Sequence, residues 1–132
     1  SIAYYALINV NDYDKKLQEQ YAAEWVSIDN VPSLYSDHNE MLIKARNMMK
    51  MKISNEPISF NLLPNLFTLS QLQKLYEAVC GEEVDKRNFR KRINEMGFIE
   101  KTELIDKTGS KRGAHLYRFN KSAYKEDPTF KL

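Results

Sequence analysis

The side chains best suited to chemistry in this chain are the basic and amide groups between Asp85 and Gly97. At about 100° per residue, Phe89, Ile93 and Met96 fall on one narrow stripe of a helix, which predicts a buried face. The rest of the surface of this helix carries Arg87, Asn88, Arg90, Lys91 and Asn94. Lys and Arg neutralise DNA phosphates, and Arg and Asn make paired hydrogen bonds to guanine or adenine edges. The pattern is typical of a helix that enters the DNA major groove, although a solvated charged face on an ordinary core helix has the same composition.

The preceding sequence predicts a second helix that would position this one. Thr68, followed three residues later by Gln71, has the form of a capping box, and residues 69–80 carry apolar side chains at helical spacing. Gly81 is suited to end that helix, and Asp85 is suited to cap the next one. Because the link between them is so short, the two helices must pack at an angle, as in a helix-turn-helix.

The following sequence predicts a β-hairpin. Residues 98–104 and 114–120 have the composition of strands, and the basic, glycine-containing segment 106–113 joins them. A hairpin directly after a helix-turn-helix indicates a winged helix, whose wing is the connecting loop. We expect contacts with phosphates or with the minor groove from Lys107, Ser110, Lys111 and Arg112. An ordinary solvated hairpin tip is the alternative.

Further candidate DNA contacts lie beside these two groups. Thr68, Ser70 and Gln71 lie where the first helix of such a motif meets the DNA backbone, but the capping role of Thr68 and Gln71 also explains their presence. Lys86 and Arg92 lie nearer the buried stripe. We expect these two side chains either to extend along the apolar surface or to bind phosphate.

The charge distribution supports a nucleic-acid partner more than the total charge does. The 132 residues carry a formal net charge of only +2. Residues 84–121, however, contain eleven Lys and Arg against five Asp and Glu, whereas residues 1–56 contain six against eight. Positive charge is therefore concentrated on the predicted helix and wing.

The remaining reactive residues predict neither catalysis nor metal binding. Cys80 is the single cysteine, and we expect it to be a packed residue in a reducing cytoplasm. His38 and His115 have no companions at metal-ligand spacing, and no Ser/His/Asp or Cys/His arrangement suggests a nucleophile. No apolar run is long enough to span a membrane, so no membrane partner is expected.

The N-terminal part predicts an incomplete α/β piece. Residues 2–10 and 21–28 have the composition of strands, and a helix is expected over 37–52. Two strands seldom form a stable sheet alone, so more sheet should come from a segment before Ser1 or from another chain. We expect a homodimer that makes contact through the first strand, Trp25 or the helix. The predicted division is 1–56, 57–120, and a polar, irregular tail over 121–132.

Residues 62–120 resemble the C-terminal winged helix of the Nudix-related transcriptional regulators. The resemblance rests on Leu-Leu-Pro at 62–64, the segment 67–73, Tyr-Glu-Ala at 76–78, Asp-Lys-Arg-Asn-Phe-Arg at 85–90, and Leu-Tyr-Arg-Phe at 116–119. Residues 1–56 are similar to the C-terminal part of the Nudix-like domain of that family, through segments 3–7 and 23–25 and through Pro32, Leu34, Asp37 and His38. The fold class predicted is α+β, with a winged helix-turn-helix after an incomplete Nudix-like piece.

The resemblance implies a bacterial repressor or activator. In that family, a Nudix-like domain senses ADP-ribose or a sugar, and the winged helix of a dimer binds a palindromic operator in double-stranded DNA. The glutamate-rich Mg²⁺ helix of the Nudix box is absent, because all four glycines lie in the winged-helix part. We therefore expect no enzyme activity and no cofactor in this chain. The alternatives are a Nudix hydrolase of nucleoside-diphosphate derivatives with a winged-helix appendage, and a winged helix that contacts only proteins.

Overall fold

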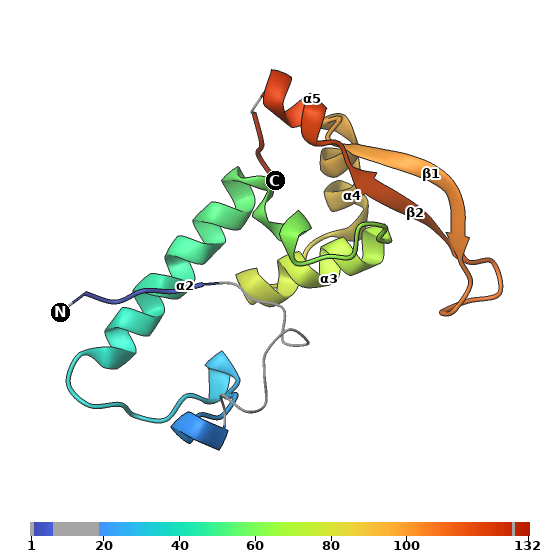
Figure 1. Cartoon of the computed structure of the whole chain (residues 1–132). Coiled ribbons are helices and arrows are strands. Elements are labelled where there is room, and N and C mark those ends of the chain that lie inside the picture. The colour runs from blue at the N-terminus through green and yellow to red at the C-terminus, as the bar shows by residue number, and fades with distance from the viewer. Residues whose placement is uncertain (1, 7–18, 128) are drawn as a thin grey trace. The chain divides into compact units, whose positions relative to one another are not determined.

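The computed structural model describes residues 2–6, 19–127 and 129–132 (Figure 1). The chain divides into two units, residues 1–47 and 48–132. The 3₁₀ helix η2 (Ile28–Asn30) lies in the first unit, and helix α2 (His38–Asn55) begins in the first unit and ends in the second. No helix within the described ranges is long and apolar enough to cross a bilayer.

The first unit holds the start of α2 through polar contacts. The backbone N–H of Leu34 donates to Asn39 Oδ1 at 2.7 Å, and Asn39 Nδ2 donates to the carbonyl of Pro32 at 3.1 Å. Arg46 forms an ion pair with Asp29 at 3.1 Å. The predicted helix over 37–52 is thus confirmed, with its end three residues later than expected.

The prediction of two strands in this part of the chain is wrong for the residues that the structure describes. Residues 2–6 and 23–27 have no regular secondary structure, and Ala22 has a positive φ of 50°. Residues 7–10 lie outside the described residues. An extended segment becomes a strand only when a neighbour supplies hydrogen bonds. In the described ranges, strand pairing is limited to the hairpin and to one bridge between Phe67 and Tyr117. Ile2 is accordingly 83% exposed.

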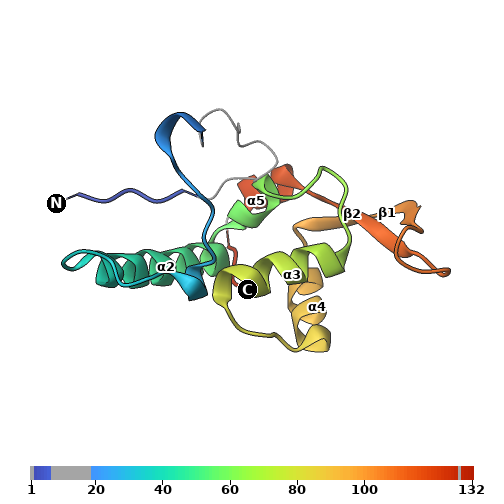
Figure 2. The ribbon, with the colours of Figure 1, turned by 90° about the horizontal axis from the view of Figure 1, so that it is seen from below.

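The second unit is a winged helix. After the last turns of α2, it contains the 3₁₀ helix η3 (Pro57–Asn61), α3 (Leu69–Cys80), α4 (Lys86–Glu95), β1 (Ile99–Asp106), β2 (Ala114–Phe119) and α5 (Lys121–Glu126). Helices α3 and α4 cross at an angle, and the β1–β2 hairpin extends away from them (Figures 1 and 2). The predicted helix-turn-helix and hairpin are confirmed.

Local signals in the sequence fix the ends of the two helices. Thr68 Oγ1 accepts from Gln71 N at 3.2 Å and Gln71 Oε1 accepts from Thr68 N at 2.8 Å, which completes the predicted capping box. Gly81 ends α3 with a left-handed φ of 70°. Asp85 Oδ1 accepts from Asn88 N at 2.7 Å and so caps α4.

The hairpin is antiparallel and contains one irregularity. Ile99 lies opposite Phe119 and Asp106 lies opposite Ala114, but the register shifts between Lys101 and Ile105. At this β-bulge, the hydroxyl of Thr102 donates to the carbonyl of Leu116 at 2.7 Å and accepts from Leu104 N at 3.3 Å. On the other edge of β2, Phe67 pairs with Tyr117 through two backbone hydrogen bonds of 3.0 and 2.7 Å. The segment before α3 therefore covers part of that edge.

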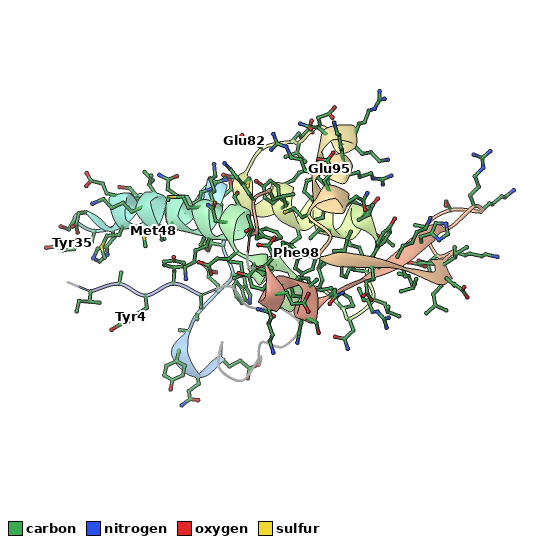
Figure 3. All side chains as sticks on the ribbon, turned by 90° about the horizontal axis from the view of Figure 1, so that it is seen from above. Tyr4, Tyr35, Met48, Glu82, Glu95 and Phe98 are labelled. Atoms are coloured by element: carbon green, nitrogen blue, oxygen red, sulfur yellow. The ribbon has the colours of Figure 1, made fainter. Side chains whose placement is uncertain are left out.

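One hydrophobic core joins these elements. Its buried residues come from the segment before α3, from α3, from α4, from the start of the hairpin and from the end of the chain: Phe67, Leu69, Leu72, Phe89, Ile93, Phe98 and Phe130. Phe89 and Ile93 are 5% and 0% exposed, as the helical stripe predicted. Phe98 is labelled in Figure 3, at the start of the hairpin.

The prediction of an irregular polar tail over 121–132 is wrong. Residues 121–126 form α5, whose N-cap Asn120 accepts from Ala123 N at 3.0 Å. Phe130 is 5% exposed, because its ring packs against Phe98 and Phe60 at centroid distances of 6.2 and 6.3 Å. Leu132 N donates to the carbonyl of Ser54 in α2 at 2.9 Å.

Candidate nucleic-acid interface

The outward face of α4 is a stripe of exposed basic and amide side chains. Arg87, Lys91 and Asn94 lie opposite the buried face and are exposed, as predicted. Lys91 Nζ lies 3.9 Å from the Glu95 carboxylate, but both side chains are more than 60% exposed, so the pair contributes little. Within the described ranges, Arg87 and Lys86 have no carboxylate at ion-pairing distance. The stripe therefore presents positive charge to solvent.

One flank of α4 faces α3 and the end of the chain. Asn88 and Arg92 line a cavity of about 220 Å³ together with Tyr76, Asp85 and Leu132. The Asn88 backbone N–H is engaged in the helix cap, whereas its side chain is exposed. Asn88 thus lies at the edge of the stripe beside the Asp85 carboxylate, where a phosphate is less favoured than a base edge.

The other flank of α4 carries Arg90, which is half-buried. Its Nη2 donates to the hydroxyl of Ser70, the second residue of α3, at 3.4 Å. The two residues border a cavity of about 270 Å³, whose wing side is formed by Gly113, Ala114 and His115. The sequence predicted Arg90 as a flanking DNA contact, but its approach to Ser70 depends on how α3 and α4 cross.

Thr68, Ser70 and Gln71, at the start of α3, are the residues predicted to contact the DNA backbone. The capping box leaves them accessible to different extents. Thr68 is 7% exposed and its hydroxyl accepts from Gln71 N. Gln71 is exposed, and its carbonyl oxygen accepts from Thr68 N, which leaves the amide NH₂ group as the donor. Ser70 is exposed on the same turn. Ser70 and Gln71 are therefore better placed than Thr68 to meet a ligand.

The wing presents exposed cations on an ordered loop. Lys107, Ser110, Lys111 and Arg112 are all exposed, and Figure 3 shows nitrogen-tipped side chains extending from the hairpin tip. The Asp106 carboxylate accepts from the backbone N–H and the hydroxyl of Thr108 at 2.9 and 2.7 Å, and these bonds lower the pKa of Asp106. Ser110 Oγ accepts from Gly113 N at 3.0 Å. These local bonds favour the loop conformation described.

Gly113 is required for the shape of the wing. Its φ is +75°, and a Cβ at this position would collide with the side chain of Ile105 and lie 3.0 Å from the carbonyl oxygen of Asp106. A residue with a side chain is disfavoured on both grounds. Gly113 therefore fixes the end of the loop beside the cavity that Arg90 borders.

The sequence reasoning gave no binding role to His115. This exposed residue of β2 lines the cavity beside Arg90, whereas the sequence pattern suggests only a metal-ligand role for an imidazole and offers no companions for it. The feature of the sequence that could have indicated a binding role is the position of His115 at the base of a basic wing. Within the described ranges, no group of three or more His, Cys, Asp or Glu residues could hold a metal ion. Burial raises the pKa of the Cys80 thiol, which is consistent with the packed role expected for it.

These features define a winged helix with a basic surface: two crossed helices, of which the second is basic and exposed, followed by a hairpin with a basic tip. Residues 59–119 match the family model of the NrtR DNA-binding winged helix domain. The resemblance to Nudix-related regulators is thereby confirmed.

A relative of known identity extends the match beyond the winged helix. The chain is 36% identical over 121 residues to the ADPR responsive transcriptional repressor NtrR of Acinetobacter baylyi. The alignment covers 90% of this chain and 48% of that protein, so the chain spans about half the length of the curated relative it matches. This relative is named a transcriptional repressor, which favours the prediction of a regulator over the hydrolase alternative.

Two solved structures share the fold. The crystal structure of Shewanella oneidensis NrtR complexed with a 27mer DNA has a TM-score of 0.59 and 23% sequence identity, and covers 80% of this chain and 46% of that one. The crystal structure of Shewanella oneidensis NrtR has a TM-score of 0.56 and 27% identity, and covers 78% of this chain and 46% of that one.

Proposed function

We propose that this chain is the DNA-binding part of a bacterial, cytoplasmic transcriptional regulator that binds a palindromic operator as a dimer. The exposed basic stripe of α4, beside a basic wing in an NrtR-family domain, is the observation that carries the proposal. The DNA-binding residues lie within 57–120 of the second unit, and the first unit, residues 1–47, belongs to the C-terminal part of a Nudix-like effector domain. Because the A. baylyi relative is named ADPR responsive, the proposed effector of the full-length protein is ADP-ribose or a similar molecule.

Three groups of residues have different proposed roles. Arg87, Asn88 and Asn94 contact base edges, since their side chains make paired hydrogen bonds to guanine or adenine. Phosphates are bound by the lysines of α4 and by exposed donors of the wing and α3: Lys86, Lys91, Gln71, Lys107, Ser110, Lys111 and Arg112. Thr68 acts by holding the first turn of α3 in place.

The proposed dimer fits the geometry of duplex DNA. Two winged helices that enter successive major grooves on one face must bind half-sites about 34–36 Å apart. Helix α2, of 18 residues, continues from the first unit into the second and is about 27 Å long. We propose that the effector changes how this helix is held and so alters the spacing of the two winged helices.

Binding titrations test the proposed interface. Duplexes are first selected by the wild-type chain from a random-sequence pool, and affinities for a selected and an unrelated duplex are then measured at several salt concentrations. Arg87→Ala/Asn94→Ala is expected to weaken binding to the selected duplex by about 1–3 kcal/mol per lost base contact and to reduce its preference over the unrelated one. Lys111→Ala is expected to weaken both alike and to lower the salt slope by about 0.9.

The same titrations separate the alternatives. A wild-type chain without salt-dependent affinity for any duplex would support a winged helix that contacts only proteins. Unchanged sequence preference in Arg87→Ala/Asn94→Ala would show that α4 does not contact bases through its outward stripe. The effector proposal needs the full-length protein, in which ADP-ribose is expected to change operator affinity, and no change would rule it out.

A further inference from the structure

Arg90 is exceptional among the basic residues of this chain. In the described ranges, three basic side chains are half-buried: Arg46, Lys50 and Arg90. Arg46 pairs with Asp29 at 3.1 Å, and Lys50 pairs with Glu82 at 3.7 Å. Arg90 has no carboxylate at ion-pairing distance among these residues. Among the described residues, its side chain makes one hydrogen bond, the 3.4 Å contact with the Ser70 hydroxyl, and its Nε is buried with no partner among them.

A half-buried guanidinium without a counter-charge is unfavourable, because it loses hydration and gains little in return. The fork of nitrogens in a guanidinium matches carboxylate and phosphate groups. The natural partner of Arg90 is therefore an anion that is not part of the described chain.

The cavity beside Arg90 is suited to such an anion. It has a volume of about 270 Å³, and a water molecule in the liquid occupies about 30 Å³, so a tetrahedral phosphate group has room in it. None of its lining residues is acidic. Ser70 supplies a hydroxyl and His115 an imidazole, and the first turn of α3 directs backbone N–H groups without intrahelical partners toward this end of the helix.

The surroundings of the cavity point to a phosphate that belongs to duplex DNA. The cavity lies between the start of α3, the flank of α4 and the base of the wing, which are the three parts of the proposed interface. We propose that this cavity binds one backbone phosphate through Arg90, Ser70 and His115, and that Arg90 positions α4 on the duplex without contacting a base. This inference rests on the proposed function. It separates Arg90 from the outward stripe of Arg87, Lys91 and Asn94.

Two substitutions that remove one positive charge each give the first test. Arg90→Met keeps most of the aliphatic stem and removes the guanidinium. Lys125→Met is the matched control, because Lys125 is exposed on α5, at the end of β2 opposite the wing loop. Both variants and the wild-type chain are titrated with the selected and the unrelated duplex over a series of salt concentrations, and thermal midpoints confirm folding.

Arg90→Met is expected to weaken binding to both duplexes by the same factor, about tenfold, and to lower the slope of log K against log salt by about 0.9. Lys125→Met should change neither quantity appreciably. A loss confined to the selected duplex would make Arg90 a base contact and overturn the inference, and so would a loss no larger than that of the control. Failure of the wild-type chain to bind any duplex would instead reject the proposed function, and with it DNA as the source of the phosphate.

A second pair of variants keeps Arg90 intact. Ser70→Glu places a carboxylate beside the guanidinium and at the N-terminus of α3, whereas Ser70→Gln is its neutral counterpart. Ser70→Glu is expected to have the higher thermal midpoint of the two and the lower affinity for every duplex, because its carboxylate occupies the place of the phosphate. Equal midpoints with equal affinities would show that Arg90 does not require an anion. Since Ser70 is exposed, this comparison holds even if Arg90→Met fails to fold.

Discussion

Phe130 should contribute strongly to stability although it lies near the end of the chain. Its side chain is 5% exposed and packs between the rings of Phe60 and Phe98. Replacing it with Ala removes a buried aromatic ring and leaves a cavity that the two remaining rings cannot fill. Such substitutions cost about 3–5 kcal/mol, out of a total of about 5–15 kcal/mol for a typical domain. For a unit of this size, each 1 kcal/mol lowers the melting temperature by about 4–8 °C, so a fall of at least about 12 °C is expected.

The measurement is urea unfolding and a thermal melt of the whole chain, both followed by circular dichroism. Thr129→Ala is the matched control, because Thr129 is the exposed neighbour and bonds only with Asp127 among the described residues. Its expected effect lies within about 0.5 kcal/mol. If Phe130→Ala unfolds within 1 kcal/mol of the wild-type chain, the end of the chain is not part of the core and this reasoning is refuted.

Three further predictions concern the wing, the pH dependence of its loop and the oligomeric state. Gly113→Ala should lower the melting temperature more than Gly97→Ala, because both glycines have a positive φ but only Gly113 has a close neighbour. Gly109→Ala should leave the melting temperature unchanged. Equal melting temperatures for the three variants would contradict this prediction. The hydrogen bonds from Thr108 lower the pKa of Asp106 below its usual 3.8, so they stabilise the wing above that pH and are lost as the pH falls through the depressed pKa. Asp106→Asn should therefore unfold with a smaller loss of stability between pH 5 and about pH 2, and an unchanged pH profile would exclude the effect. Sedimentation of the chain at micromolar concentration should give a dimer; a well-folded monomer would contradict the predicted pairing.

The helix-turn-helix was predictable because its signals are local. Thr68 and Gln71 form their capping box within one turn, and Asp85 caps α4 through a residue three positions away. The buried stripe of α4 follows from helical spacing alone. Such features need no knowledge of the remainder of the chain.

The features that the sequence did not predict depend on partners distant along the chain. Residues 21–28 have strand composition, but composition cannot supply a neighbouring strand. Phe130 lies in a largely polar segment whose few apolar residues follow no regular spacing, so no periodicity marks it as buried. The contact of Arg90 with Ser70 spans 20 positions and depends on the crossing of two helices. Sequence therefore indicated which basic residues to consider, and only the structure distinguishes the roles proposed for them.

The bulge in β1 has a consequence for how the protein behaves at high concentration. The row of free N–H and C=O groups along an exposed edge strand is a template on which another chain can add a strand and begin to aggregate. Between Lys101 and Ile105 the register of β1 shifts, and Leu104 N bonds to the Thr102 hydroxyl. The regular row is thereby interrupted in the middle of the strand. A long hairpin with exposed Leu104 and Ile105 can extend into solvent and still resist edge-to-edge association.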